Sequence, residues 1–107
     1  MSNPKIQVRQ SLFGIEQALK ASLLWQSIPP DDAAFTSIQP FCLDCMQAEQ
    51  WLQWVLLPRM HALLDSDAPL PERVAILPYF EAAFDGRTES ITPLLAELRR
   101  FDDLFTG

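Results

Sequence analysis

Residues 51–64 read WLQWVLLPRMHALL and form the densest apolar run in the chain, with two of its three tryptophans. The four residues DCMQ at 44–47 precede this run. They are typical of a helix start, because the Asp side chain can accept a hydrogen bond from a backbone N–H three residues on and the Gln can reach back. We therefore predict a helix from about Met46 to about Leu64 that lies at the centre of the domain.

The surface of this predicted helix is apolar almost all round. Pro58 lacks the N–H of a regular helical residue, so we expect a kink there. A wheel of about 100° per residue separates the apolar residues into three faces. The first face contains Trp51, Trp54, Val55, Pro58 and Ala62, and the second contains Leu52, Leu56 and Leu63. The third face contains Leu57, Met60 and Leu64. Such a helix is either central or shared between copies. If the third face is exposed in the monomer, it predicts an unidentified protein partner or a homodimer.

Three further helices flank the central one in the sequence. Their expected ranges are 4–25, about 78–84 and 92–105. The Asn3-Pro4 and Thr92-Pro93 pairs favour helix starts, as a capping residue followed by proline. We find no alternating strand pattern and no repeat. The sequence thus predicts an all-α fold, a small four-helix up-and-down bundle-like domain with a kinked central helix, as a single domain over residues 1–107.

The expected core residues follow helical spacing. In the first helix the buried stripe is Val8, Leu12, Ile15, Leu19 and Leu23, and in the last it is Leu94, Leu95, Leu98, Phe101, Leu104 and Phe105. Asp102 and its charged neighbours should face solvent. Gly14 either weakens its helix by about 1 kcal/mol or admits a close approach of another backbone. Residues 33–41 indicate an ordered loop that its aromatic residues hold in place, with room for one helical turn.

The charge balance excludes several classes of function. The chain has 107 residues, a formal net charge of −6 and a pI near 4.5. No basic stripe is present to neutralise phosphates, so we expect no direct nucleic-acid binding. The same charge opposes binding to an anionic membrane surface. No signal-peptide core is visible, and the longest apolar stretch is too interrupted to span a membrane. We therefore expect a cytoplasmic protein.

Residues with catalytic potential are few. Cys42 and Cys45 form a C-x-x-C motif, but the strand before it that a redox site requires is missing, and so are further zinc ligands. Two ordinary thiols are the simpler interpretation. His61, the single histidine, has no nucleophile arranged around it in the sequence. We expect no catalytic residues, metal or cofactor, and the sequence favours a non-enzymatic role.

A candidate polar patch centres on Arg59. This charge lies among apolar neighbours on the central helix and should seek a carboxylate, for which Glu81 is the candidate. Gln53 and Tyr79 would complete the patch. One interpretation is an ion pair that fixes helix packing, and the alternative is a binding site for an anionic ligand.

The aromatic residues allow two interpretations. Trp25, Trp51 and Trp54 with Phe35 and Phe41 are the kind of residues that line a pocket, with Phe41, Trp51 and Trp54 as the candidate lining. Aromatic residues at helical spacing also commonly form a core. In that case the indole N–H groups need acceptors such as Gln39 or Gln53.

Four segments together resemble the YqcC-like family of small bacterial proteins of unknown function. They are residues 39–41 (QPF), 51–60 (WLQWVLLPRM), 70–71 (LP) and 78–81 (PYFE). The resemblance extends over nearly the whole chain and is most specific at Trp-x-x-Trp followed by Pro-Arg-Met. It implies an all-α bundle and no catalytic residues. Members are often encoded beside a tRNA pseudouridine synthase, which implies an accessory role.

These observations lead to three functional hypotheses. The first is a non-catalytic helical protein-interaction module. The second is a protein or enzyme that binds an anionic small molecule through Gln53, Arg59, Tyr79 and Glu81. The third is an accessory factor that binds a tRNA pseudouridine synthase rather than RNA.

Overall fold

The computed structural model describes residues 4–36, 46–66, 69–71, 74–86 and 91–105. Its elements are α1 (Pro4–Ala21), the 3-10 turn η1 (Asp32–Thr36), α2 (Ala48–Trp51), the π turn η3 (Leu52–Leu56), α3 (Leu57–Asp65), α4 (Leu77–Ala83) and α5 (Thr92–Asp103). The segments α2, η3 and α3 follow one another without a gap and form one central helix. The described ranges contain four helices and no strand, so the predicted all-α bundle is confirmed.

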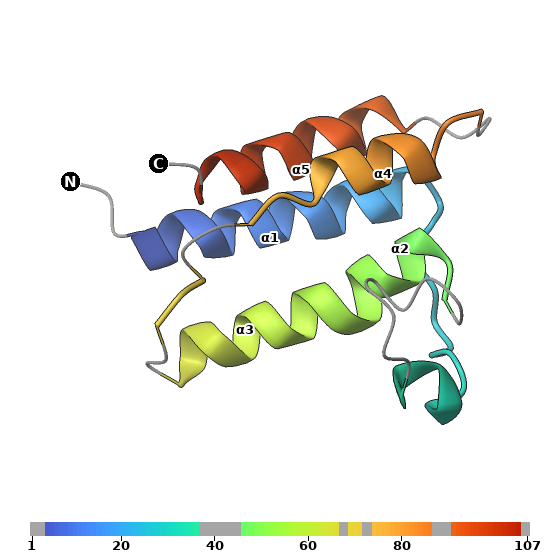
Figure 1. Cartoon of the computed structure of the whole chain (residues 1–107), viewed down its shortest axis with the longest axis horizontal. Helices are drawn as coiled ribbons and strands as arrows, with labels where there is room; N and C mark the ends of the chain where they lie inside the picture. The colour runs from blue at the N-terminus through green and yellow to red at the C-terminus, as the bar shows by residue number, and fades with distance from the viewer. Residues whose placement is uncertain (1–3, 37–45, 67–68, 72–73, 87–90, 106–107) are drawn as a thin grey trace.

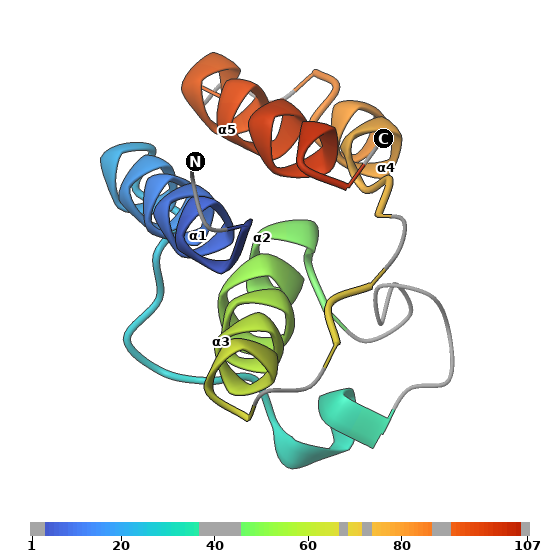
Figure 2. The same cartoon turned by 90° about the vertical axis from the view of Figure 1, so that its left-hand side faces the viewer.

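The four helices alternate in direction (Figure 1). Figure 2 shows α1, α5 and α4 as an arch over the central helix. The largest interface between helices that are not consecutive joins α1 to α5. The core between these elements contains fully buried side chains from every helix, including Leu12, Leu52, Phe80, Leu94 and Phe101.

The central helix begins at Ala48, two residues later than the sequence predicts. The N–H of Gln47 donates to Oε1 of Gln50 at 2.7 Å, so Gln50 supplies the cap. Asp44, the predicted capping residue, lies outside the described residues. Pro58 does interrupt the regular α pattern, and the interruption takes the form of the π turn just before it, in which the N–H of Leu57 donates to the carbonyl of Leu52.

The π turn changes which side chains of the central helix face the core. It contains one residue more than an α-helical turn, so the helix after it lags by up to about 100°. Leu57, Met60 and Leu64 therefore join Leu52 and Leu56 on one buried face. The prediction of a separate third face was wrong, because a wheel of constant angle takes no account of the extra residue. These three side chains are buried and form no exposed apolar surface.

The end of α1 differs from the sequence prediction. The helix stops at Ala21, and Leu23 takes a left-handed conformation with φ of 62°. The N–H of Leu24 donates to the carbonyl of Leu19 at 2.9 Å, and the N–H of Leu23 donates to that of Lys20 at 3.1 Å. These two bonds define a Schellman cap, which usually carries glycine at the left-handed position. Leu23 is 91% exposed and not part of the buried stripe, whereas Leu24 is buried.

We expect Leu23→Gly to stabilise the protein by about 1 kcal/mol. The left-handed conformation strains a residue with a Cβ by about 1–2 kcal/mol, and an exposed leucine loses little packing when it is removed. Leu23→Ala is the matched control, since it shortens the side chain but keeps the Cβ, and it should leave stability nearly unchanged. Urea unfolding followed by circular dichroism measures both. An unchanged or lowered midpoint for Leu23→Gly would contradict the expectation.

Asp102 is buried rather than exposed to solvent, and it joins α5 to α4. Its Oδ1 accepts from the N–H of Ile76 at 3.0 Å, and its Oδ2 accepts from the N–H of Leu77 at 2.8 Å. These N–H groups stand at the start of α4, where the helix itself offers them no acceptor. A carboxylate also interacts favourably with the positive end of the helix dipole. Asp102 therefore caps α4 from a different helix.

Two smaller predictions are corrected at α1 and α5. Thr92 is already within α5, whose N-cap is Ile91, and no side-chain cap bond is formed there. Gly14 does receive a close neighbour, but that neighbour is a side chain and not a backbone. A Cβ added to Gly14 would collide with the carboxylate of Glu97 on α5. The glycine therefore makes room for Glu97 in the interface between α1 and α5.

Candidate interaction surface

The predicted polar patch is not assembled. Gln53 is buried, and its amide is bonded to the backbone of Gln26. Arg59 on α3 and Glu81 on α4 are both exposed, and no ion pair joins them within the described part of the chain. Tyr79 is half-buried and packs edge-on against Phe80, with ring centroids 5.0 Å apart. Among the described residues, the four side chains therefore have different surroundings, and none of these contacts joins one of them to another.

Burial raises the pKa of Tyr79 above its usual value of 10.0, and the charge of Glu49 raises the pKa further. Glu49 is itself buried, near the start of the central helix. Both effects disfavour the phenolate, because burial removes its hydration and a negative charge repels it.

We expect the titration midpoint of Tyr79 to lie above pH 10, which tyrosinate absorbance measures directly because the chain has one tyrosine. The raised pKa means that the folded state holds this proton more tightly than the unfolded state. The resulting stabilisation is complete below pH 10 and is lost as the pH rises through the folded pKa. Glu49→Gln should lower the midpoint only partly, since burial remains. A midpoint at or below 10 in the folded protein would refute this expectation.

The predicted aromatic lining is divided between core and surface. Trp51 is half-buried and packs on the core, with its ring centroid 6.0 Å from that of Phe80. Trp54 is half-buried, and its Nε1 has no acceptor among the described residues. Gln53, one of the two acceptors that we predicted for an indole, is engaged by Gln26 instead. Phe41, like Gln39, lies outside the described residues.

The remaining candidate residues are the two cysteines and the single histidine. Cys42 and Cys45 lie outside the described residues. His61 is half-buried on α3. The described ranges contain no group of three histidine, cysteine, aspartate or glutamate residues that would hold a metal ion. None of the helices in these ranges is both long enough and apolar enough to cross a membrane.

The exposed large hydrophobic side chains lie mainly in the first third of the chain. They are Ile6 and Phe13 on α1, Leu23, Trp25 and Ile28 in the connection after α1, Phe35 in η1, and Leu104 at the end of α5. Among the residues that the structure describes, six of these seven fall between residues 6 and 35. Phe35 was expected to hold its loop in place, but its side chain is exposed. The single helical turn expected in that loop is present as η1.

Gln53 fixes the connection after α1 on the central helix. The N–H of Gln26 donates to Gln53 Oε1 at 2.8 Å, and Gln53 Nε2 donates to the carbonyl of Gln26 at 2.6 Å. Gln50 Nε2 adds a bond to the side chain of Gln26 at 3.2 Å. On one side of this anchor, Lys20 Nζ lies 5.0 Å from the ring centroid of Trp25. The connection is therefore fixed while its apolar side chains face outward.

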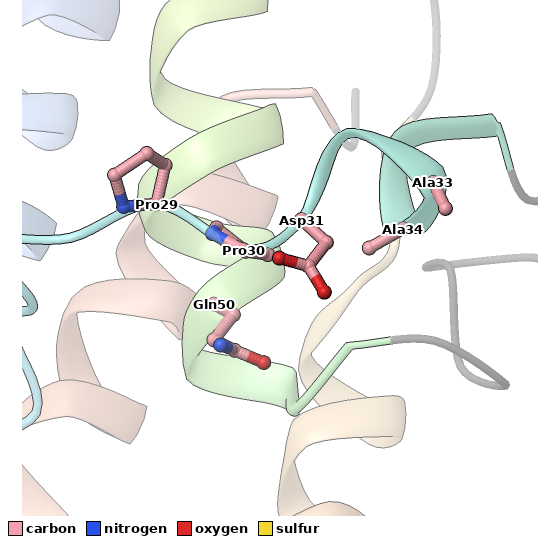
Figure 3. A pocket seen from close by; sticks show the side chains of 6 residues that line it. All are labelled: Pro29, Pro30, Asp31, Ala33, Ala34 and Gln50. Carbon is pink, nitrogen blue, oxygen red and sulfur yellow. The ribbon is translucent and has the colours of Figure 1, made fainter.

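Two hollows lie beside this connection. The first has a volume of about 460 Å³ and lies between residues 29–34 and Gln50 of α2, with Asp31 and Gln50 as the polar side chains of its lining (Figure 3). The second has a volume of about 370 Å³ and is lined by Leu23, Leu24, Gln26, Gln47 and Glu49. We call residues 23–36 together with these two hollows the loop surface.

Sequence reasoning missed two residues. Gln26 fixes the loop surface on the central helix, and Asp102 fixes the start of α4. The signal for Gln26 was the amide of Gln53 within an apolar run, because a buried amide needs bonding partners. For Asp102 no such signal was available, since the pattern of α5 places it beside other charged residues.

Comparisons with known proteins agree with this fold. A family model described as "DUF446: tRNA pseudouridine synthase C" matches residues 7–104. A protein of Haemophilus influenzae described as uncharacterized is 45% identical over 93 residues, which cover 84% of this chain and 88% of that protein. The YqcC protein of Escherichia coli, also described as uncharacterized, is 43% identical over 98 residues, covering 92% and 90% respectively.

One longer relative carries the name of an enzyme. A protein of Pectobacterium carotovorum named tRNA pseudouridine synthase C is 65% identical over 65 residues. The matched residues are 61% of this chain but only 17% of the length of that protein.

A solved structure has the same fold. The solution NMR structure of E. coli YqcC matches with a TM-score of 0.84 at 40% sequence identity, and the match covers 97% of this chain and 89% of that one. Together with the family match over residues 7–104, these relatives show that the chain belongs to the DUF446 family, which includes YqcC and corresponds to the YqcC-like family that its sequence resembles.

Proposed function

We propose that this chain is a non-catalytic interaction module that binds a protein partner through the loop surface. The observation that supports this most directly is the exposure of Leu23, Trp25, Ile28 and Phe35 on a segment that Gln53 holds in place. A fixed apolar surface binds with a small loss of conformational entropy, because the loop is already ordered before the partner arrives. The two hollows beside it would receive side chains of the partner.

The proposed partner is a tRNA pseudouridine synthase. The support is the Pectobacterium relative, in which a segment 65% identical to this chain belongs to a longer protein with that name. When two chains act together, joining them in one polypeptide raises their effective concentration without new contacts. The net charge of −6 favours contact with the enzyme rather than with its RNA substrate.

Co-purification tests this function. The tagged chain and the tRNA pseudouridine synthase of the same organism are co-expressed, and the lysate is treated with nuclease before capture. We expect the synthase to be retained, and the double variant Trp25→Ser/Ile28→Ser to lose it while keeping its helical circular dichroism. Leu104→Ser is the matched control, because Leu104 is as exposed as Trp25 but lies at the end of α5.

Two outcomes would refute the proposal. If the synthase is not retained, it is not the partner. If the double variant retains it as well as the wild type does, the loop surface is not where it binds.

A further inference from the structure

The outer face of α1 repeats every seven residues. Three neighbouring rows of side chains run along it. The apolar row contains Ile6 and Phe13 and ends at Lys20. The charged row contains Arg9 and Glu16, and the amide row contains Gln10 and Gln17. Seven residues are nearly two helical turns, so successive members of each row lie within about 20° of one another around the helix. The rows are therefore straight enough to face a second helix along most of their length.

This face is directed away from the rest of the protein. Ile6 is 54% exposed and Phe13 is 62% exposed, an unusual exposure for two large apolar side chains on one row. Figure 2 shows α1 at the edge of the bundle, with α5 and α3 on its inner side. The two charged groups of the face already have partners, Asp65 for Arg9 and Lys20 for Glu16. Both pairs are at the surface, where an ion pair contributes little and exchanges readily.

We infer that a second copy of this chain docks on this face, with the two α1 helices antiparallel and the two-fold axis at Phe13. Arg9 lies four residues before Phe13, about 6 Å along the helix, and Glu16 lies three residues after it, about 4.5 Å. In an antiparallel pair Arg9 of one copy is then within about 1.5 Å of the level of Glu16 of the second copy. The symmetry produces this contact twice.

The other two rows fit the same axis. Phe13 meets Phe13 of the second copy at the axis, and Ile6 lies level with the aliphatic part of Lys20 of the second copy. Gln10 lies beside Gln17 of the second copy, where their amides can bond. A parallel arrangement would instead place the charged row beside the amide row of the second copy, without an ion pair between copies, so the charged row favours the antiparallel one.

The contact is small, because α1 has 18 residues and offers two apolar side chains per copy. We therefore expect a weak dimer, with a dissociation constant on the order of 0.1 mM. This inference does not depend on the proposed synthase partner, since the face lies on α1 and outside the loop surface. Its test needs the chain alone.

Sedimentation equilibrium of the full chain, from about 10 µM to about 1 mM, measures the dimer. Arg9→Glu places two glutamates in contact across each half of the interface, and Glu16→Arg places two arginines there. Each single change should weaken the dimer at least about fivefold, because like charges in direct contact repel. The double variant Arg9→Glu/Glu16→Arg restores opposite charges and should return the dissociation constant to within about twofold of the wild type.

Three controls separate this contact from an effect on folding. Phe13→Ser should abolish the dimer without loss of helical circular dichroism, because the side chain is exposed. Arg99→Glu, an exposed charge reversal on α5, should leave the dimer unchanged. Asp65→Ala removes the partner of Arg9 within the chain and should not weaken the dimer.

The inference is overturned by any of three results. The first is a chain that is purely monomeric over the whole concentration range. A dimer insensitive to Phe13→Ser lies elsewhere on the protein. A double variant as defective as the single ones shows that Arg9 and Glu16 do not face each other across the axis.

Discussion

Asp102→Ala should destabilise the protein by about 3 kcal/mol. The substitution removes two charge-assisted hydrogen bonds, to the N–H groups of Ile76 and Leu77, and leaves both groups without an acceptor at the start of α4. The effect is large because α4 has only seven residues and a helix of that length is not stable on its own. Urea unfolding followed by circular dichroism gives the loss of stability.

Two further variants isolate the capping role. Asp102→Asn keeps the size of the side chain but replaces one acceptor with an NH₂ group, so it should cost at least half as much as Asp102→Ala. Asp103→Ala, one residue further along α5 and exposed, should change stability by less than about 0.5 kcal/mol. Hydrogen exchange of the Ile76 and Leu77 amides should become faster in Asp102→Ala. A loss below about 1 kcal/mol would show that α4 is held by packing alone.

Gln53→Leu should destabilise the protein by about 2 kcal/mol, although leucine is similar in size and more apolar. The loss arises because both the N–H and the carbonyl of Gln26 lose their partner in a partly buried position. Gln53→Ala should cost more than Gln53→Leu, since it also leaves a cavity beside the central helix. Unfolding in urea ranks the two variants, and hydrogen exchange at Gln26 reports the release of the connection after α1.

Gln50→Leu is the control for the predicted effect of Gln53→Leu. It removes a partly buried side-chain bond of 3.2 Å to Gln26 and the exposed bond to the Gln47 N–H, and it leaves both backbone bonds of Gln26 to Gln53 in place. We expect it to cost less than Gln53→Leu. If Gln53→Leu is neutral, the anchor does not hold the loop surface, and the argument that this surface is ordered before binding fails.

Much of the helical architecture follows from local patterns in the sequence. The break before Pro78 predicts α4 to within one residue, because proline cannot continue a preceding helix and is well suited to a first turn. The stripe Val8, Leu12, Ile15 and Leu19 is buried as its spacing predicts. These features depend on residues close to one another in the chain, which the sequence displays directly.

The features that the sequence does not reveal depend on contacts between distant residues or on local changes of geometry. Leu23 continues the spacing of the first stripe, but the helix has already ended in a left-handed turn that nothing in a leucine indicates. Asp102 has a backbone partner on another helix. Among the candidate site residues, Gln53 was predicted to join the patch around Arg59 or to accept from an indole, but its partner is the backbone of Gln26.

The π turn at Leu52–Leu56 makes the number of residues in the central helix as important as their identity. A substitution inside the turn keeps the relation between the two halves of the helix. Deletion of a single residue there would convert the turn to ordinary α-helix and rotate α3 by about 100° relative to α2. Met60 and Leu64 would then leave the core together. Functional relatives should therefore vary the side chains between Trp51 and Pro58 more freely than they vary the length of that interval.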